Sequence, residues 1–455
     1  MLIDTNKKGV ILKPFSIALC CLLLVGCASK EPLTQQKLTK KTAPKTLRDL
    51  EELPQEAFAY SFFQDAHSIG DIDSFVQDYF RVWNLQKISI DPDEAMWAFE
   101  SFDANNSYSM TLQALEEDFF RSQKQNCNLS RYGTINKNAI TLKTLNLRAM
   151  PTDEPLFLDP KKAGEGYPFD YLQNSLIAAN KPLFVSHYSA DKKWVFVETS
   201  FGFGWLKSRD IAYIDEKYTD IWQKAKQVFL LKDGVAINDA QGHYLFDSRV
   251  GMVLPLIDED AKNYYVLTVS ADKADKPYYN RSAISKKIAS SHLLKFEKKS
   301  IDAVLGELQK GRYGWGGIYE QRDCSATLRD FFTPFGLWLP RNSSSQSKVG
   351  KVISLKGMRD AQKLQIIKQQ AKPFSTLLYK PGHIALYVGT FNDQVVIFQN
   401  VWGVKTKKGE KEGRYIVAKP VFSTLELGKE LDDFDPKASM LFKLESMNIL
   451  DSSAF

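Results

Sequence analysis

Apolar residues in the first part of this chain of 455 residues recur at helical spacing. Residues three or four positions apart share one face of a helix. Two sets in segment 46–128 follow this rule: Phe75, Tyr79, Phe80 and Trp83, and further on Leu112, Leu115, Phe119 and Phe120. The pattern predicts a helical block over 46–128 with these side chains in its core. Cys127, at the end of the block, is expected to be an ordinary small residue.

Between 129 and 294 the pattern changes to short alternating stretches separated by turns. "ITLKTLNLRAMPT" alternates, and "KWVFVETSFGFGWLKSRDIAYI" contains two strands around a glycine-rich turn. This predicts a small β-barrel over 129–215. "MVLPLIDED" and "NYYVLTVSA" indicate a second barrel over 216–294 by a weaker pattern. Such barrels bind short peptides or pack on a neighbouring domain, and the pattern leaves both roles open.

The last segment, 295–455, combines a helix with a long hairpin. Apolar residues follow Cys324 at helical spacing: Leu328, Phe331, Phe332 and Phe335. Asp323 is a favourable N-cap residue, and Pro334 with Gly336 ends the helix. His383 begins the strand "HIALYVG", which we expect to be buried on one face. A turn at 390–393 returns the chain along "QVVIFQN". The predicted fold class is α+β with several domains.

The first 45 residues have the composition of processing and linker segments. Three lysines precede "FSIALCCLLLVG", which is too short for a membrane-spanning helix and has the layout of a secretory signal. "LVGC" resembles a bacterial lipobox. The resemblance implies a signal peptide over 1–26, a lipid on the Cys27 sulfur and a flexible tether over 27–45. An ordinary signal peptide with an incidental Cys27 is the alternative.

The residue after Cys27 bears on localisation. Ala28, in place of aspartate, favours the outer membrane in Gram-negative bacteria. We therefore expect a lipoprotein of the cell envelope that faces the periplasm.

Composition excludes some classes of function. The chain is 44% hydrophobic and 25% charged, as in soluble globular proteins, and its net charge of +6 is small for its length. No dense run of lysine and arginine indicates nucleic-acid binding. The five histidines are scattered and no C-x-x-C occurs, so we expect no metal and no cofactor. The oligomeric state is not indicated.

Only two cysteines, Cys127 and Cys324, remain after loss of the signal peptide and lipidation of Cys27. A single bridge between them is possible in an oxidising compartment. Cys324 has further interpretations: a core thiol, a metal ligand or a nucleophile. Its predicted place in the first turn of a helix favours the nucleophile, because the helix dipole stabilises a thiolate and free N–H groups there can face an oxyanion.

A nucleophilic thiol needs a base, and His383 is the candidate. The predicted hairpin brings Gln399 and Asn400 back near His383, where the amide of either residue can hold the second imidazole nitrogen. The register of the hairpin decides which of the two takes this role. Cysteine on a helix, histidine on a strand and an amide on the next strand is the papain-like order.

Five segments, "YGWGG", "DCSA", "LPRNSSSQ", "GHIALYVG" and "QNVWG", resemble the NlpC-type cysteine endopeptidases of bacterial cell walls. The helical block and two barrels, which look like bacterial SH3-like domains, resemble the multi-domain subgroup of that family. The resemblance implies a C-terminal papain-like peptidase domain over 295–455. It also assigns a nucleophile, a general base and a third position, often histidine: Cys324, His383 and Gln399. Residues expected to contact substrate are Tyr313, Asp323, Ser325 and Ser343.

The resemblance implies a reaction as well. The expected activity is hydrolysis of the amide between γ-D-glutamate and an L-diamino acid, meso-diaminopimelate or L-lysine, in peptidoglycan stem peptides. In the subgroup the first barrel closes the upstream end of the cleft, which implies released peptides with a free N-terminal L-alanine. One alternative is an amidase or cross-bridge peptidase acting on the intact sacculus. The other is a catalytically silent lipoprotein that binds peptidoglycan, which the uncharged Gln399 favours.

Overall fold

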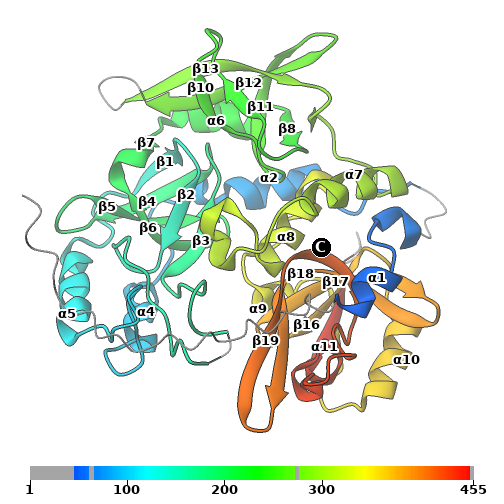
Figure 1. Ribbon diagram of the computed structural model, residues 1–455. Coiled ribbons are helices and arrows are strands. Elements are labelled where there is room, and N and C mark those ends of the chain that lie inside the picture. Colours follow the sequence, from blue (N-terminus) through cyan, green and yellow to red (C-terminus); the bar gives the residue numbers. More distant parts are fainter. Residues whose placement is uncertain (1–45, 61–65, 163, 272–275, 451–455) are drawn as a thin grey trace, which may run out of the picture. The chain divides into compact units, whose positions relative to one another are not determined.

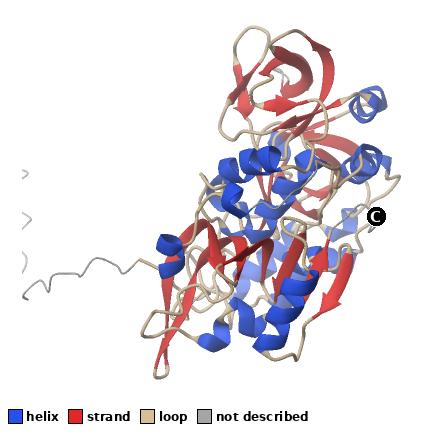
Figure 2. Ribbon diagram, turned by 90° about the vertical axis from the view of Figure 1, so that its right-hand side faces the viewer, coloured by secondary structure: helices blue, strands red, loops and turns tan. Residues whose placement is uncertain are grey.

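The computed structural model describes residues 46–60, 66–162, 164–271 and 276–450. The predicted signal peptide, Cys27 and the tether lie outside the described residues. The fold class is α+β, as predicted, with helical, barrel and mixed segments following one another along the chain (Figures 1 and 2). No helix within the described ranges combines the length and the apolar character that a bilayer crossing requires.

The N-terminal block is built from short helices: α1 (Arg48–Glu52), α2 (Ile72–Phe80), α3 (Pro92–Ala95), α4 (Trp97–Ser101) and α5 (Glu117–Asn126). The first predicted apolar face, from Phe75 to Trp83, is buried as expected. The second prediction was wrong in part, because α5 begins only at Glu117. Leu112 is exposed with φ +64°, in a loop where Tyr108 pairs with Phe157 and Ala114. The bridge between Tyr108 and Ala114 closes a turn over these residues, so the helix begins only after it.

The first barrel contains a seven-stranded antiparallel sheet in the order β3-β2-β6-β5-β4-β1-β7. Its strands are β1 (Lys137–Thr141), β2 (Leu145–Arg148), β3 (Gln173–Ile177), β4 (Pro182–Tyr188), β5 (Trp194–Thr199), β6 (Gly202–Lys207) and β7 (Ile211–Tyr213). Leucine, isoleucine and valine side chains fill its core. Strand β3 matters most for the site, because it packs against the loop that precedes Cys324.

The second barrel follows helix α6 (Glu216–Lys224) and contains a five-stranded sheet and a separate hairpin. Its strands are β8 (Gln227–Leu230), β9 (Ala236–Asn238), β10 (Tyr244–Asp247), β11 (Val253–Glu259), β12 (Asn263–Ala271), β13 (Pro277–Ser285) and β14 (Ala289–Ser290). Phe229 and Trp222 share one buried cluster with Phe75 and Trp83 of the N-terminal block. The helical block therefore packs directly on this barrel.

The C-terminal segment is a six-stranded sheet in the order β15-β20-β16-β17-β18-β19. Its strands are β15 (Lys351–Ser354), β16 (Thr376–Lys380), β17 (His383–Phe391), β18 (Gln394–Lys408), β19 (Lys411–Thr424) and β20 (Ser446–Ile449). The helices are α7 (Lys298–Leu308), α8 (Cys324–Phe332), α9 (Ser343–Gln346), α10 (Asp360–Gln370) and α11 (Met440–Lys443).

Strand β17 differs from its prediction, because both of its faces are buried. Ile384 and Leu386 pack in the core that contains α7 and α8, whereas Ala385 and Tyr387 pack in the core that contains α10 and α11. A strand covered by helices on both sides loses the polar face that alternation would show. The predicted turn is present between β17 and β18, with Asn392 and Asp393 at positive φ.

Helix α8 lies under this sheet as the apolar pattern predicted. Leu328, Phe331 and Phe332 are buried, and the chain leaves the helix through a short turn that ends at Gly336, φ +76°. Cys127 and Cys324 are both free thiols, so the bridge that the sequence left open is not formed.

The N-terminal segment also contacts the C-terminal sheet. The Asp49 carboxylate of α1 accepts hydrogen bonds from the backbone N–H (2.7 Å) and the hydroxyl (2.8 Å) of Thr424 at the end of β19. The Gln55 side chain donates to the Phe422 carbonyl and accepts from the Phe422 N–H, as a neighbouring strand would. Segment 47–60 thereby lies against the edge strand β19 through side-chain hydrogen bonds.

Candidate active site

Cys324 is the first residue of α8 and is 7% exposed. Asp323 caps the helix, its carboxylate accepting from the Ala326 N–H at 2.8 Å. The backbone N–H of Ile384 donates to the Cys324 sulfur, and Ile384 directly follows His383 on β17. The structure thus places the predicted nucleophile next to the start of the strand that carries the predicted base.

Burial decides the protonation of both groups. It raises the pKa of the Cys324 thiol to about 12, and the Asp323 carboxylate acts in the same direction, against the N–H donor of Ile384. Burial and then the Lys380 ammonium lower the pKa of His383 to about 4. Desolvation disfavours a charged form of either sign. The helix dipole therefore does not suffice to ionise Cys324, contrary to the expectation from its position, and the pair is a neutral thiol beside a neutral imidazole.

A chain of hydrogen bonds fixes the orientation of His383. Its Nε2 lies 2.8 Å from Gln399 Oε1, Gln399 Nε2 donates to Ser423 Oγ at 2.7 Å, and Ser423 donates to the Thr424 carbonyl at 2.9 Å. A carbonyl can only accept, so the single hydroxyl proton of Ser423 is used in the bond to Thr424. Ser423 Oγ must therefore accept from the Gln399 amide. Gln399 then presents its oxygen to His383, which places the proton on Nε2 and leaves Nδ1 as the free base.

Asn400 has a different position. Its amide donates to the Arg322 carbonyl at 2.7 Å and to Thr327 Oγ1 at 3.0 Å, on the segment that enters α8. Of the two residues considered as orienters, Gln399 is the one that contacts His383, and Asn400 holds the helix instead.

Asp323 and Ser325, predicted to contact substrate, form a buried cluster with Arg341. The Arg341 guanidinium donates to both Asp323 oxygens, to Ser325 Oγ at 2.9 Å and to Ser175 Oγ of the first barrel at 2.7 Å. Burial raises the pKa of Asp323, but Arg341 outweighs it and holds that pKa below its usual range. Asp323 is therefore a carboxylate that already has a charged partner.

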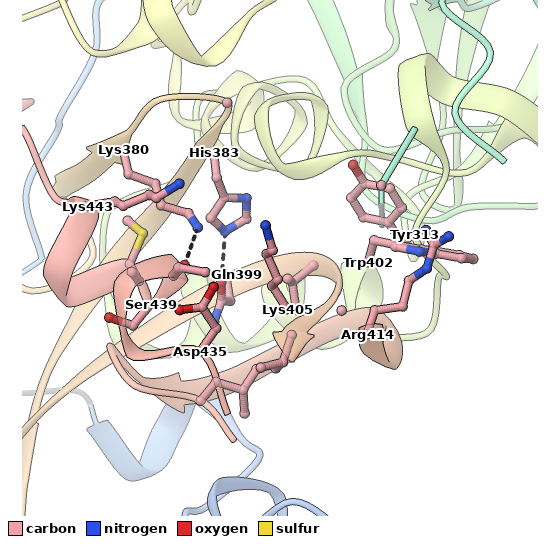
Figure 3. A pocket seen from close by; sticks show the side chains of 18 of the residues that line it. Tyr313, Lys380, His383, Gln399, Trp402, Lys405, Arg414, Asp435, Ser439 and Lys443 are labelled. Carbon is pink, nitrogen blue, oxygen red and sulfur yellow. Dashed lines mark hydrogen bonds between the residues drawn. The ribbon is translucent and has the colours of Figure 1, made fainter. Parts of the chain in front are cut away.

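Two hollows with shared lining residues lie at the predicted catalytic residues. The Cys324 cavity measures about 470 Å³ and is walled by the first barrel, by Trp97 and Phe102 of the helical block and by Ser343. The His383 pocket measures about 320 Å³ and lies between β16, β18, β19 and the segment 434–443 (Figure 3). Tyr313 and Gly382 line both. Tyr313 and Ser343 thus face space in which a substrate can lie.

Sequence reasoning did not find Arg341, Lys380 or Arg414. Arg341 stands inside the quoted segment "LPRNSSSQ", where an arginine shortly after a buried "DCS" segment was an available signal. Lys380 and Arg414 lie in ordinary strand sequence, and only the folded sheet, with its strands in the order β16-β17-β18-β19, places them around the pocket that His383 also lines. In the described part of the chain, no group of three or more His, Cys, Asp or Glu side chains has a metal-binding arrangement.

A cysteine at the start of a helix, a histidine on the adjacent antiparallel sheet and an amide behind that histidine define the papain-like class of site. Comparison with known families agrees. Residues 310–408 match the NlpC/P60 family, residues 16–132 the NLPC_P60 N-terminal stabilising domain, residues 155–207 an SH3 domain of the SH3b1 type and residues 215–261 one of the SH3b2 type. The chain is a multi-domain member of the NlpC/P60 family.

Similar proteins share this architecture. A solved structure described as a novel NlpC/P60 endopeptidase from Photobacterium damselae subsp. piscicida superposes with a TM-score of 0.75 at 22% identity, covering 88% of this chain and 97% of that one. A γ-D-glutamyl-L-lysine dipeptidyl-peptidase from Bacillus cereus is 23% identical over 198 residues, 42% of this chain. The match spans 54% of that relative, about half its length. At 22% identity, the likeness to the solved structure shows the fold of this chain and nothing further.

Proposed function

We propose that this protein is a cysteine endopeptidase that cleaves the γ-D-glutamyl–L-diamino acid amide of peptidoglycan stem peptides. The observation that carries the proposal is that His383, oriented by Gln399, directly precedes Ile384, whose backbone N–H donates to the Cys324 sulfur, and that the two hollows lined by His383 and by Cys324 share Tyr313 and Gly382. Membership of the NlpC/P60 family supports the substrate class, and the activity for which the Bacillus cereus relative is named supports the γ-D-glutamyl bond.

The geometry suggests how the neutral pair reacts. As the Cys324 sulfur attacks the γ-carbonyl, its proton passes to Nδ1 of His383, and the carbonyl oxygen takes the negative charge. Backbone N–H groups in the first turn of α8 are placed to stabilise that charge. His383 then gives its proton to the leaving amine as the C–N bond breaks. A water molecule, deprotonated by His383, cleaves the thioester and restores the thiol.

The substrate is proposed to be a released peptide with a free N-terminal L-alanine. The first barrel forms a wall of the Cys324 cavity through Gln173, Asn174 and Ser175, and α4 adds Trp97. A glycan-linked stem continues upstream of L-alanine and would meet this wall. Asp323 and Ser325 are proposed to receive the amine, with Arg341 fixing their positions.

The test is turnover of L-Ala-γ-D-Glu-meso-diaminopimelate and of intact sacculi, incubated separately and followed by mass spectrometry. We expect L-Ala-γ-D-Glu from the tripeptide, little release from sacculi, and neither product with Cys324→Ala. Release from sacculi alone would favour the amidase or cross-bridge alternative. No product from either substrate would support a silent binding protein.

We further propose that the chain is a cell-envelope lipoprotein anchored through Cys27 and facing the periplasm. "LVGC" and the preceding apolar stretch support this. Cells grown with labelled palmitate should label the wild-type protein, whereas Cys27→Ala should stay unlabelled and leave the membrane fraction. Label retained by Cys27→Ala would exclude this anchor.

A further inference from the structure

The His383 pocket has an unusual charge. Four basic side chains of the described residues line it, together with one carboxylate. The basic residues are Lys380, Lys405, Arg414 and Lys443, and the carboxylate belongs to Asp435 (Figure 3). Of these cations Lys405 has a partner nearby, since its Nζ lies 2.5 Å from Glu412 Oε1. Among the residues that the structure describes, the Lys380 ammonium has one hydrogen-bond acceptor, the Ala438 carbonyl at 3.2 Å. The pocket therefore presents a surplus of positive charge beside the proposed catalytic base.

Two donors in the same pocket lack an acceptor. Trp402 Nε1 and Arg414 Nη1 are both buried and have no hydrogen-bond partner among the described residues. Buried N–H groups in folded proteins are almost always paired, and an exception indicates a missing acceptor. Burial and the Lys443 ammonium also lower the pKa of Lys380 to about 8, as expected where two cations approach without an anion between them. These donors and cations make the pocket suited to an acidic ligand group.

The orientation of the bound substrate determines that the leaving group lies in the His383 pocket. The acyl half must lie with its carbonyl on Cys324, in the cavity walled by the first barrel. The proton donor to the leaving amine is His383, so the residue that carries this amine must lie on the His383 side. The space on that side is the cationic pocket, which His383 and Gln399 themselves line.

We propose that this pocket binds the carboxylates of the leaving diamino acid, so that the preferred substrate carries meso-diaminopimelate and not L-lysine. The inference rests on the proposed function and names its substrate. Lysine brings one carboxylate and a lone distal ammonium, which the positive charges of Lys380, Arg414 and Lys443 repel. Diaminopimelate brings a second carboxylate at the distal carbon. The planar guanidinium of Arg414 suits a carboxylate, Trp402 Nε1 supplies a further donor, and Asp435 remains for the distal ammonium.

The experiment compares two tripeptides, L-Ala-γ-D-Glu-meso-diaminopimelate and L-Ala-γ-D-Glu-L-lysine, which differ in the distal carboxylate. Wild-type protein should show kcat/KM about tenfold or more higher for the diaminopimelate peptide, the value of one charge-assisted hydrogen bond. Arg414→Gln and the milder Trp402→Phe should each reduce that ratio, mainly through KM for the diaminopimelate peptide. Lys411→Gln, an exposed charge change on the same hairpin, should leave the ratio unchanged.

The outcomes separate this inference from the function on which it rests. Equal cleavage of both peptides, or a preference for lysine, overturns the inference and leaves the endopeptidase intact. A ratio that Arg414→Gln and Trp402→Phe leave unchanged overturns the residue assignment. If neither peptide is cleaved while circular dichroism shows a folded chain, the proposed function fails and the inference fails with it.

Discussion

At the scale of single residues, the proposed base is oriented by an uncharged partner. Gln399 contacts His383 through its amide oxygen and is itself held by Ser423. An amide fixes the tautomer but stabilises an imidazolium less than a carboxylate does. Burial therefore prevails, and the pKa of His383 falls to about 4.

Gln399→Glu should change the pH dependence of activity. A carboxylate at this position favours the imidazolium, so the pKa of His383 should rise by about one unit or more. The base is then protonated at a higher pH, and the acidic limb of the kcat/KM profile should move upward by the same amount. Gln399→Ala is the matched control: it should lower kcat without moving this limb upward. An acidic limb that stays in place in Gln399→Glu would contradict the role given to Gln399.

Much of the residue-scale site could be predicted from sequence. The place of Cys324 in the first turn of a helix followed from helical spacing after "RDC", and the turn at 390–393 predicted that Gln399 and Asn400 return near His383, while the family resemblance favoured Gln399. The prediction failed where chemistry depends on residues from separate strands. Arg414 of β19 and Lys380 of β16 meet only in the folded sheet, and the protonation of Cys324 depends on burial, which spacing does not reveal.

At the scale of elements, α8 is held in place by ion pairs between side chains as well as by its apolar face. Asp330 contacts Arg322 at 2.7 Å, Arg329 at 3.1 Å and Arg249 of the second barrel at 3.6 Å. Arg322 also contacts Asp233 of that barrel. The helix that carries Cys324 is thus tied to a domain that does not line the Cys324 cavity.

Asp330→Asn should destabilise the fold. Removing one member of a buried ionic cluster leaves its partners uncompensated, at a cost of about 3–5 kcal/mol in the free energy of unfolding. Asp118→Asn, on an exposed pair with Arg121, should change it by less than about 1 kcal/mol. Urea unfolding measures both. Equal effects of the two substitutions would show that the cluster behind α8 is not a stabilising element.

The same residue predicts a pH dependence of stability. Burial alone would raise the pKa of Asp330, but the guanidinium groups of Arg329, Arg322 and Arg249 lower it to about 2, below its usual value of 3.8 in an unfolded chain. The unfolded chain therefore binds the proton first, and the contribution of Asp330 is lost as the pH falls from 3.8 to 2. Asp330→Asn should show a shallower loss of stability in this window. An unchanged slope would contradict the lowered pKa.

At the scale of the whole described chain, the first barrel is built into the site. Gly316 and Gly317 have φ of +58° and +90°, and a Cβ on Gly317 would lie 2.4 Å from the Leu176 Cβ of β3. The Gln173 amide donates to the Gly316 carbonyl at 3.2 Å, and Trp315 Nε1 donates to the Asp170 carbonyl at 3.1 Å. The wall of the Cys324 cavity depends on this close contact.

Gly317→Ala should therefore loosen the wall. We expect kcat/KM for the free tripeptide to fall by roughly 10- to 100-fold, since small displacements of a bound substrate cost this much. The preference for the free tripeptide over its N-acetylated form should fall as well. Gly409→Ala has a similar positive φ but meets no atom within 4 Å, so it should leave both quantities unchanged. An unaltered preference in Gly317→Ala would separate the barrel from substrate selection.

The contact between Asp49 and Thr424 limits where the chain can be cut. Thr424 accepts from Ser423, which supports Gln399 behind His383, so α1 buttresses the proposed catalytic relay from outside the peptidase domain. A protease that released the chain by cutting before Leu47 would leave this support in place. A cut after Glu52 would remove it, so under the proposed lipid anchor and the proposed activity we expect shedding by the first cut to preserve turnover and shedding by the second to lower it.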